Sequence, residues 1–334
     1  MKKLAIPVLF LFCFSSSVYT LDDVTYPRKP ISKSGFLNYH VPSEYPTIQS
    51  AVDAAFTSGL NNITIIVEEG EYRETVIATG LKNLKLIGRN ARILPPSDYE
   101  FIDPPEGDSF PASSFKLINC ENFRVEGFTF IGDNFADITR QSYPMGNSIH
   151  SYNSSGTISN NIIFNYFDGI CFQVDNLRWM KGVISDNYIH NCIWSGIFAI
   201  GSHNLLIQNN KIAFTIPKVL SISVGIWTDG GIGIISENHI INYWAVDYYP
   251  QQKKLSSSDL WPINHQFTPR ENYQVTGNTF EQSAAVTQIS NLQMAADRPY
   301  RFLRKTHKVY NHFINVSQGN NNKDQPDIVM LRPE

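Results

Sequence analysis

Asparagine recurs at one fixed place in a series of short apolar runs, and this repeat constrains the fold more than any other feature of the sequence. The run "ISNNIIFNYFDGICF" contains Asn161 and Asn165, and "ISDNYIHNCIWSGIF" places Asn187 and Asn191 in the same two positions. The first position recurs five times, at Asn161, Asn187, Asn210, Asn238 and Asn278. The intervals between these copies are 26, 23, 28 and 40 residues.

Such a repeat predicts an all-β fold of stacked coils. The intervals fit coils of roughly 22 to 25 residues that carry occasional loop insertions. Three short strands fill such a coil, because strands average about five or six residues, and no convincing helical pattern interrupts the copies. We therefore expect a single-stranded parallel β-helix, a solenoid in which every strand pairs with the coils above and below it.

Stacking also gives the asparagines a role. Residues at the same phase of successive coils lie about 4.8 Å apart, so each side-chain amide can donate to the carbonyl oxygen of the next. A buried amide without a partner would cost a few kcal/mol, whereas a stacked one is satisfied. We expect a structural Asn ladder in one turn and favour it over a catalytic role, because catalytic sites seldom recur in every coil.

The N-terminus has the layout of a signal peptide. Lys2 and Lys3 precede an apolar run that is too short to span a bilayer, and small polar residues follow it. We expect residues 1–20 to be this signal and the mature chain to be secreted or periplasmic. Residues 21–45 are expected to form an extended leader.

The β-helix domain is expected over residues 46–315, with 316–334 as a C-terminal tail. It should begin with a capping helix in "PTIQSAVDAAF", where Thr47 is placed to cap the start and five apolar residues recur at helical spacing: Ile48, Ala51, Val52, Ala55 and Phe56. The polar, proline-bearing segment 250–271 widens the last Asn interval and is expected to be a projecting loop.

Charge and cysteine content narrow the possible partners and compartments. The formal net charge is -3, and the 27 Lys and Arg residues are scattered singly, which argues against nucleic acid and against an anionic membrane. Three cysteines follow the signal: Cys120, Cys171 and Cys192. We interpret them as small buried apolar side chains, with a single disulfide as the alternative. We expect a monomer.

Three opening segments resemble a known group of proteins. "YPTIQSAVDAAF", "IIVEEGEYRETV" and "LKNLKLIGRN" are similar to the first coils of pectin methylesterases, and residues 44–290 resemble the right-handed parallel β-helix proteins of the pectin-lyase-like group. The sequence has no QDT tripeptide or DFIFG, as methylesterases would, and none of the NTD, GHG and RIK motifs of polygalacturonases. The resemblance therefore implies the fold and not the activity.

The resemblance places a substrate along the outer face of the first strand of each coil. Aligning "SIHSY", "GICFQ", "GIFAI", "GIWTD" and "AVDYY" and alternating the side chains gives one inward row of Ile149, Ile170, Ile197, Ile226 and Val246. It also gives two outward rows, the first His150, Cys171, Phe198, Trp227 and Asp247, and the second Tyr152, Gln173, Ile200, Asp229 and Tyr249.

Two aspartates on these rows are candidates for acid and base catalysis. Asp229 and Asp247 would lie on successive coils, roughly 8 Å apart at the backbone. Such a gap suits an inverting hydrolase, in which one carboxyl group protonates the leaving oxygen and the other activates water. The alternative is that both are solvated surface acids, or that Asp229 serves the turn at Gly230 and Gly231.

The remaining candidates surround this pair. His150 could act as an acid or base, although a polar surface histidine is the simpler interpretation. Trp227, Trp244 and Tyr249 could stack on sugar rings, with Tyr152 and Gln173 beside them. Asp168 sits at a strand entrance, and Arg178 and Lys181 are expected in a loop over the same face, where a lyase would place a base; plain surface charge is the alternative.

Two functions remain open after this reading. The first is a secreted carbohydrate-active protein, a hydrolase or lyase acting on an acidic polysaccharide along the outer face. The second is a noncatalytic β-helix that binds glycan or presents a surface. We expect no metal site and no cofactor, except that a lyase could use Ca²⁺ to neutralise a uronate.

Overall fold

The computed structural model describes the coils of the chain with gaps between them. The described residues are 35–96, 113–132, 146–174, 179–192, 195–201, 203–214, 224–229, 231–241, 263–266, 272–281, 287–290 and 312–314. The predicted signal peptide, most of the predicted leader and the predicted tail over 316–334 lie outside these residues.

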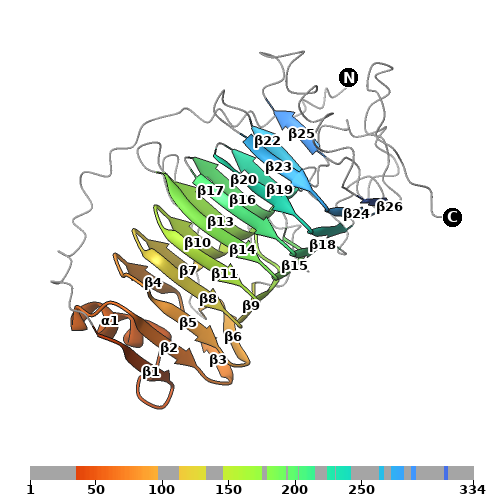
Figure 1. The fold of residues 1–334 in the computed structure, drawn as a ribbon. Helices are drawn as coiled ribbons and strands as arrows, with labels where there is room; N and C mark the ends of the chain where they lie inside the picture. Colours follow the sequence, from red (N-terminus) through yellow and green to blue (C-terminus); the bar gives the residue numbers. More distant parts are fainter. Residues whose placement is uncertain are drawn as a thin grey trace, which may run out of the picture.

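Each coil contributes one strand to each of three sheets (Figure 1). Sheet 1 contains β1 (Leu37–Val41), β2 (Ile63–Val67), β5 (Lys85–Gly88), β8 (Glu121–Glu126), β11 (Ser155–Ser159), β14 (Met180–Ser185), β17 (His203–Gln208), β20 (Ile232–Ser236) and β23 (Asn272–Thr276). Sheet 2 contains β4 (Val76–Thr79), β7 (Ser113–Ile118), β10 (Asn147–Tyr152), β13 (Asp168–Val174), β16 (Ser195–Gly201), β19 (Val224–Asp229), β22 (Ile263–Gln266) and β25 (Thr287–Ser290). Sheet 3 contains β3 (Gly70–Arg73), β6 (Ala91–Leu94), β9 (Thr129–Ile131), β12 (Ile162–Phe164), β15 (Tyr188–His190), β18 (Lys211–Ala213), β21 (His239–Ile241), β24 (Thr279–Glu281) and β26 (His312–Ile314).

The chain visits the sheets in a constant order, and each strand pairs in parallel with the same strand of the next coil. From β2 it passes to β3 in sheet 3 and β4 in sheet 2, and then returns to sheet 1 at β5. The pairs β10–β13, β11–β14 and β12–β15 represent one such step in all three sheets. This connectivity confirms the predicted parallel β-helix.

The core is a column of stacked apolar side chains. The inward row predicted for sheet 2 is confirmed for four of its five members, because Ile149, Ile170, Ile197 and Ile226 are partners in successive strands and each is 0% exposed. The place predicted for Val246, which lies outside the described residues, is taken by Ile263. Burial of an isoleucine side chain contributes about 1.5–3 kcal/mol. A repeated row of such residues therefore fixes the register of the coils, since a slip by one residue would turn the whole row outward.

The Asn ladder is confirmed between sheets 1 and 3. Nδ2 of Asn161 donates to Oδ1 of Asn187 at 3.1 Å, and the same contact measures 2.9 Å from Asn187 to Asn210, from Asn210 to Asn238 and from Asn238 to Asn278. A left-handed residue precedes each ladder position, as at Asn160, Asp186 and Asn209. The five coils that carry the ladder, from β11 to β24, therefore turn this corner in the same way.

The helix α1 (Ile48–Ser58) covers the N-terminal end of the coil stack (Figure 1). The predicted cap is confirmed, because Oγ1 of Thr47 accepts the N–H of Ser50 at 3.1 Å and Gly59 ends the helix in a left-handed conformation. Its buried face consists of Ile48, Ala51, Val52 and Ala55. The helix thus shields the first coil from water and covers an open strand edge.

Segment 250–271 is not a projecting loop throughout. Residues Ile263–Gln266 form β22, which pairs in parallel with β19 of sheet 2. The sequence "INHQ" has a single apolar residue, so no alternation marked it as a strand. The insertion therefore precedes the sheet 2 strand of this coil and does not follow it.

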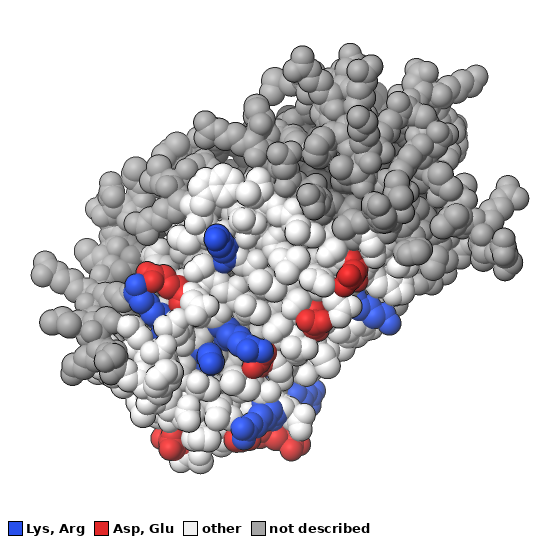
Figure 2. All heavy atoms as spheres, viewed as in Figure 1, with Lys and Arg blue, Asp and Glu red and all other residues white. Residues whose placement is uncertain are grey.

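The three cysteines after the predicted signal are buried, Cys120 and Cys192 in the core and Cys171 on the outward row of sheet 2. Cys120, Cys171 and Cys192 are 1%, 4% and 0% exposed and are thiols. Among the described residues, no helix is long and apolar enough to cross a membrane. Figure 2 shows acidic and basic side chains intermixed on the visible face, without a broad field of one sign.

Candidate functional site

The outer face of sheet 2 carries the first predicted outward row in the predicted register. His150 is the partner of Lys116 in β7 and of Cys171 in β13. The row continues from Cys171 to Phe198 and from Phe198 to Trp227. Strand alternation therefore identified these neighbours correctly from the sequence.

The second outward row also has the predicted order at the backbone. Tyr152 is the partner of Gln173, which is followed by Ile200 and then by Asp229. Tyr152 and Gln173 are half-buried, and the side chain of Asp229 lies outside the described residues. The two rows together form a strip of half-buried polar and aromatic side chains along the coil axis.

His150 is the most enclosed member of this strip, although it was expected on an open face. It is 3% exposed, and its Nε2 lies 3.2 Å from Oε1 of Gln173. Because a carboxamide oxygen only accepts, this contact requires Nε2 to carry the proton. Burial first, and then the charge of Lys116, lower the pKa of His150 to about 4. The imidazole is therefore neutral at pH 7.

Lys116 brings a cation to this strip and was missed by the sequence reasoning. It is half-buried in β7, on the rung next to His150, and burial lowers the pKa of its ammonium group. The available signal was the segment "SSFKLINC", one coil before "SIHSY", which was not aligned with the later strands.

Aromatic rings occupy both ends of the described strip. The rings of Phe198 and Trp227 meet edge to face at 5.5 Å, and both side chains are half-buried. The rings of His150 and Tyr152 meet in the same manner at 6.2 Å. In an edge-to-face pair the two ring planes are turned away from each other, so apolar ring surface and polar ring atoms are presented in different directions. A sugar, which carries both C–H groups and hydroxyl groups, can contact both.

Asp168 lies in the turn at the start of sheet 2, on the inward side of the strand. It lies two residues before Ile170 in β13, so both side chains point to the inward face of the sheet. Asp168 is 5% exposed, and it accepts a hydrogen bond from Oγ of Ser195 at 2.5 Å. Burial raises the pKa of Asp168 to about 7, even though the bonds from Ser195 lower it. Asp168 therefore belongs to a buried polar row, with Asn147 and Ser195 as its register partners.

The register predicted for the rung after β19, on which Asp247 was placed, is wrong. The rung opposite Trp227, where Asp247 was placed, is occupied by Asn264, and the residue opposite Asp229 is Gln266. The sequence alignment placed the insertion at 250–271 after the sheet 2 strand of this coil, whereas that strand is β22, which comes after most of the inserted residues. Asp247, Tyr249, Trp244 and Arg178 themselves lie outside the described residues.

Lys181 was expected in a loop over the outer face of sheet 2, and this expectation is wrong. It lies in β14 of sheet 1, is exposed, and is the partner of Asn204. The charged segment looked like a loop because its glycine and tryptophan interrupt the apolar pattern. The structure therefore does not bring Lys181 to the strip.

The described outward residues of sheet 2 offer few ligands of the kind that Ca²⁺ prefers. From β4 to β16 they contain no carboxylate, and Ca²⁺ prefers several oxygen ligands of that kind. Within the described ranges, no group of three His, Cys, Asp or Glu side chains gathers in a way that could hold a metal ion.

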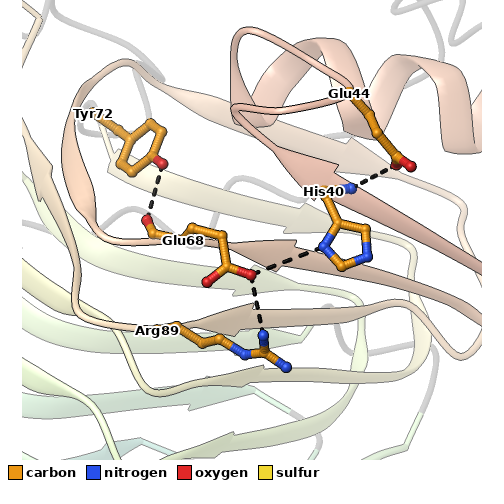
Figure 3. Close-up of polar contacts among 5 residues, drawn as sticks. All are labelled: His40, Glu44, Glu68, Tyr72 and Arg89. Carbon is orange, nitrogen blue, oxygen red and sulfur yellow. Dashed lines mark hydrogen bonds and ion pairs between the residues drawn. The ribbon is translucent and has the colours of Figure 1, made fainter.

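A separate polar cluster joins the first coils on sheet 1 (Figure 3). Oε1 of Glu68 lies 3.1 Å from the guanidinium of Arg89 and 3.9 Å from Nδ1 of His40. The hydroxyl of Tyr72 donates to the backbone oxygen of Glu68 at 2.9 Å, and Glu44 accepts the N–H of His40 at 2.9 Å. The side chains of His40, Glu68 and Arg89 are 37%, 40% and 58% exposed, whereas Tyr72 is buried. The cluster therefore ties neighbouring strands together and does not enclose a ligand.

Comparison with known proteins supports the same architecture. The family described as "Right handed beta helix region" matches residues 116–254. The matched residues cover less than half of the chain and lie within its parallel β-helix. No curated protein matches its sequence.

Solved structures are similar to the chain at low identity. Pectin methylesterase PemA from Erwinia chrysanthemi is similar at 13% identity, with a TM-score of 0.49, over 81% of this chain and 97% of that one. Escherichia coli YbhC is similar at 12% identity, with a TM-score of 0.41, over 80% of this chain and 75% of that one. Identities of this order carry no information about activity.

Proposed function

We propose that this β-helix is an exported protein that binds an acidic polysaccharide along the outer face of sheet 2. The observation that carries the proposal is the outward row in which Lys116 and His150 lie on adjacent rungs and the Phe198–Trp227 pair follows. No described outward residue from β4 to β16 is acidic. The only formal charge on that stretch is therefore positive.

The chemistry of the row matches a polymer of uronic acids. The ammonium group of Lys116 can pair with a sugar carboxylate, and its half-buried position strengthens that pairing relative to a fully solvated one. The rings of Phe198 and Trp227 offer apolar ring surface to sugar C–H groups, while Tyr152 and Gln173 offer hydrogen bonds. Rungs about 4.8 Å apart repeat these contacts along a linear chain.

A second candidate is β-elimination on the same strip. Neutral His150 lies between Lys116 and Tyr152, so a base, a cation for the uronate carboxylate and a phenolic proton donor are neighbours. In that reaction the base takes the proton next to the carboxylate, and the glycosidic oxygen leaves with a proton from the acid. The 3% exposure of His150 favours binding over elimination.

The test is binding of the secreted protein to polygalacturonate and alginate, with neutral dextran as the reference polymer. Lys116→Gln and Trp227→Ala should each weaken binding to the uronate polymers by about two- to tenfold. Lys85→Gln, at an exposed position of sheet 1, is the matched control and should bind as the wild type does. Equal affinity for dextran and the uronate polymers would refute the proposal.

The same samples decide between binding and cleavage. Elimination creates an unsaturated sugar that absorbs in the ultraviolet, whereas hydrolysis creates reducing ends without that absorbance. Appearance of the unsaturated product, lost in His150→Ala, would establish the second candidate. Binding without either product would establish a noncatalytic glycan-binding β-helix.

A further inference from the structure

Three rings gather on the outer face of sheet 3, away from the strip on sheet 2. The rings of Tyr188 and His190 stack at 5.7 Å with an angle of 21° between their planes. The ring of Phe164 stands edge-on to both, at 6.0 Å from Tyr188 and 5.9 Å from His190. We call Phe164, Tyr188 and His190 the ring cluster. All three side chains are half-buried, so each keeps part of its surface open to solvent.

A lysine borders the ring cluster. Lys211 is the partner of Tyr188 on the next rung, and its ammonium lies 5.6 Å from the centre of the Tyr188 ring. Lys211 is exposed, so its charge is held beside the rings and remains available to a ligand. On the other side of Tyr188 lies Ile162, which is 40% exposed.

One cation and two acids lie near the ring cluster: Lys211 is on the sheet, whereas Asp186 and Glu237 are in the turns before β15 and β21 and accept hydrogen bonds from Asn209 and Gln208. The described outward residues of sheet 3 from β9 to β21 include no acidic side chain, and Lys211 is the only one of them with a fixed charge. Burial first, and then the charge of Lys211, lower the pKa of His190, so the imidazole is neutral at pH 7. The acid Asp186, in the preceding turn, accepts a hydrogen bond from Nδ2 of Asn209 at 2.6 Å.

We propose that the ring cluster and Lys211 form a second binding site for an acidic polysaccharide. Two of the three rings carry a polar atom, the hydroxyl of Tyr188 and the ring nitrogens of His190, so the surface offers apolar contact and hydrogen bonds together, as a sugar requires. Lys211 supplies the charge complementary to a uronate. A protein partner would need a wider apolar patch than these residues offer.

The ligand class rests on the proposed function, whereas the location of the site does not. Sheet 2 and sheet 3 are different walls of the same coils, so one protein could hold two polymer chains. Occupation of both walls would cross-link the polysaccharide. Cross-linking is therefore the property that separates two sites from one.

The experiment is oxidative footprinting of the whole secreted protein with polygalacturonate, with dextran as the reference polymer. Polygalacturonate should protect Tyr188 and Phe164 at least twofold from oxidation, and dextran should not. Protection of Trp227 in the same sample reports sheet 2 separately. Tyr188→Ala and Lys211→Gln should lose the light scattering from cross-linked polymer and keep protection at Trp227, while Lys85→Gln should keep both.

Each outcome has a distinct meaning. Protection at Trp227 without protection at Tyr188 would overturn the second site and leave the proposed function standing. Protection at Tyr188 alone would support the ring cluster and refute sheet 2 as the binding face. Absence of protection at both would overturn both proposals. Protection of Tyr188 that rises with protein concentration and ignores the polymer would assign the cluster to self-association, which also overturns it.

Discussion

Asn187 donates its side-chain N–H to Oδ1 of Asn210 at 2.9 Å, and its backbone N–H donates to the same oxygen at 3.1 Å. Asn210 repeats both contacts with Oδ1 of Asn238, one from its backbone N–H and one from its side chain. One oxygen per coil therefore satisfies two donors of the coil before it. A ladder position must accept from the coil before it and donate to the coil after it. The carboxamide of asparagine does both, through Oδ1 and Nδ2, and therefore extends the ladder in both directions.

Removing one ladder side chain should destabilise the protein strongly. Asn187→Leu deprives Asn161 of the acceptor for its backbone and side-chain N–H groups. It also removes the side-chain donor to Oδ1 of Asn210, which keeps only the backbone N–H of residue 187. Unsatisfied buried polar groups cost about 1–3 kcal/mol each, so we expect a loss of about 2–5 kcal/mol in the free energy of unfolding, measured by urea denaturation. Asn204→Leu, at an exposed position of β17, is the control and should stay within about 0.5 kcal/mol. Equal melting of the two variants would contradict the ladder.

Two left-handed glycines should respond differently to alanine. Gly80 has a φ of 65°, and a Cβ there would meet no atom within 4 Å, so Gly80→Ala should cost only the conformational penalty of about 1–2 kcal/mol. Gly127 has a φ of 78°, and a Cβ there would lie 2.4 Å from the backbone oxygen of Gly88. Gly127→Ala should therefore cost clearly more, about 3 kcal/mol or above. Similar unfolding midpoints for the two variants would show that the coils can separate at this turn.

Periodic features of the fold could be predicted from the sequence because they recur in every coil. The ladder asparagines and the inward isoleucines of sheet 2 each recur at the same position of several coils. One wrongly aligned coil therefore does not hide either pattern. The strand β22 could not be predicted, because one coil carries an insertion and "INHQ" alone does not reveal on which side of the strand it falls. Asp247 was misplaced for this reason.

The site was less predictable than the fold, because burial depends on what covers a residue. Strand alternation gave His150 its correct row, but it could not show that an outward histidine would be 3% exposed. Asp168 was read as an entrance residue, although parity with Ile170 already pointed it inward. The ring cluster was missed since the strands of sheet 3 that carry it are only three residues long, which is too short for an alternating pattern to be recognised.

Asp168 should make the stability of the protein fall as the pH rises. Its pKa is raised from 3.8 to about 7 by burial, so the folded state holds a proton that the unfolded state has released between these values. The contribution is fully present below about pH 4 and is lost as the pH approaches 7. Asp168→Asn can still accept from Ser195 and should remove this slope, leaving the variant more stable than the wild type at pH 8. Urea denaturation at several pH values measures the difference between the two proteins.

The control for this difference is Asp53→Asn at an exposed position of α1. Buried histidines add a slope of the opposite sign, because burial lowers the pKa of His150 and of His203 to about 4, and this slope is common to all the proteins compared. A difference between wild type and Asp168→Asn that is independent of pH from 4 to 8 would show that Asp168 does not hold the proton.

The two neighbours of His150 on the strip should move its pKa in opposite directions. The charge of Lys116 lowers it and the hydrogen bond to Gln173 raises it, while burial is the larger cause of the low value of about 4. Lys116→Gln removes a cation from the adjacent rung and should raise the pKa of His150. Gln173→Leu removes the acceptor that stabilises the protonated ring and should lower it further. The imidazole C–H resonances of His150, followed by NMR as a function of pH, measure both shifts, and Lys85→Gln should leave them unchanged. If the pKa of His150 shifted in the same direction in Lys116→Gln and Gln173→Leu, Lys116 would act on His150 through packing and not through its charge. That outcome would count against the binding of a uronate on sheet 2.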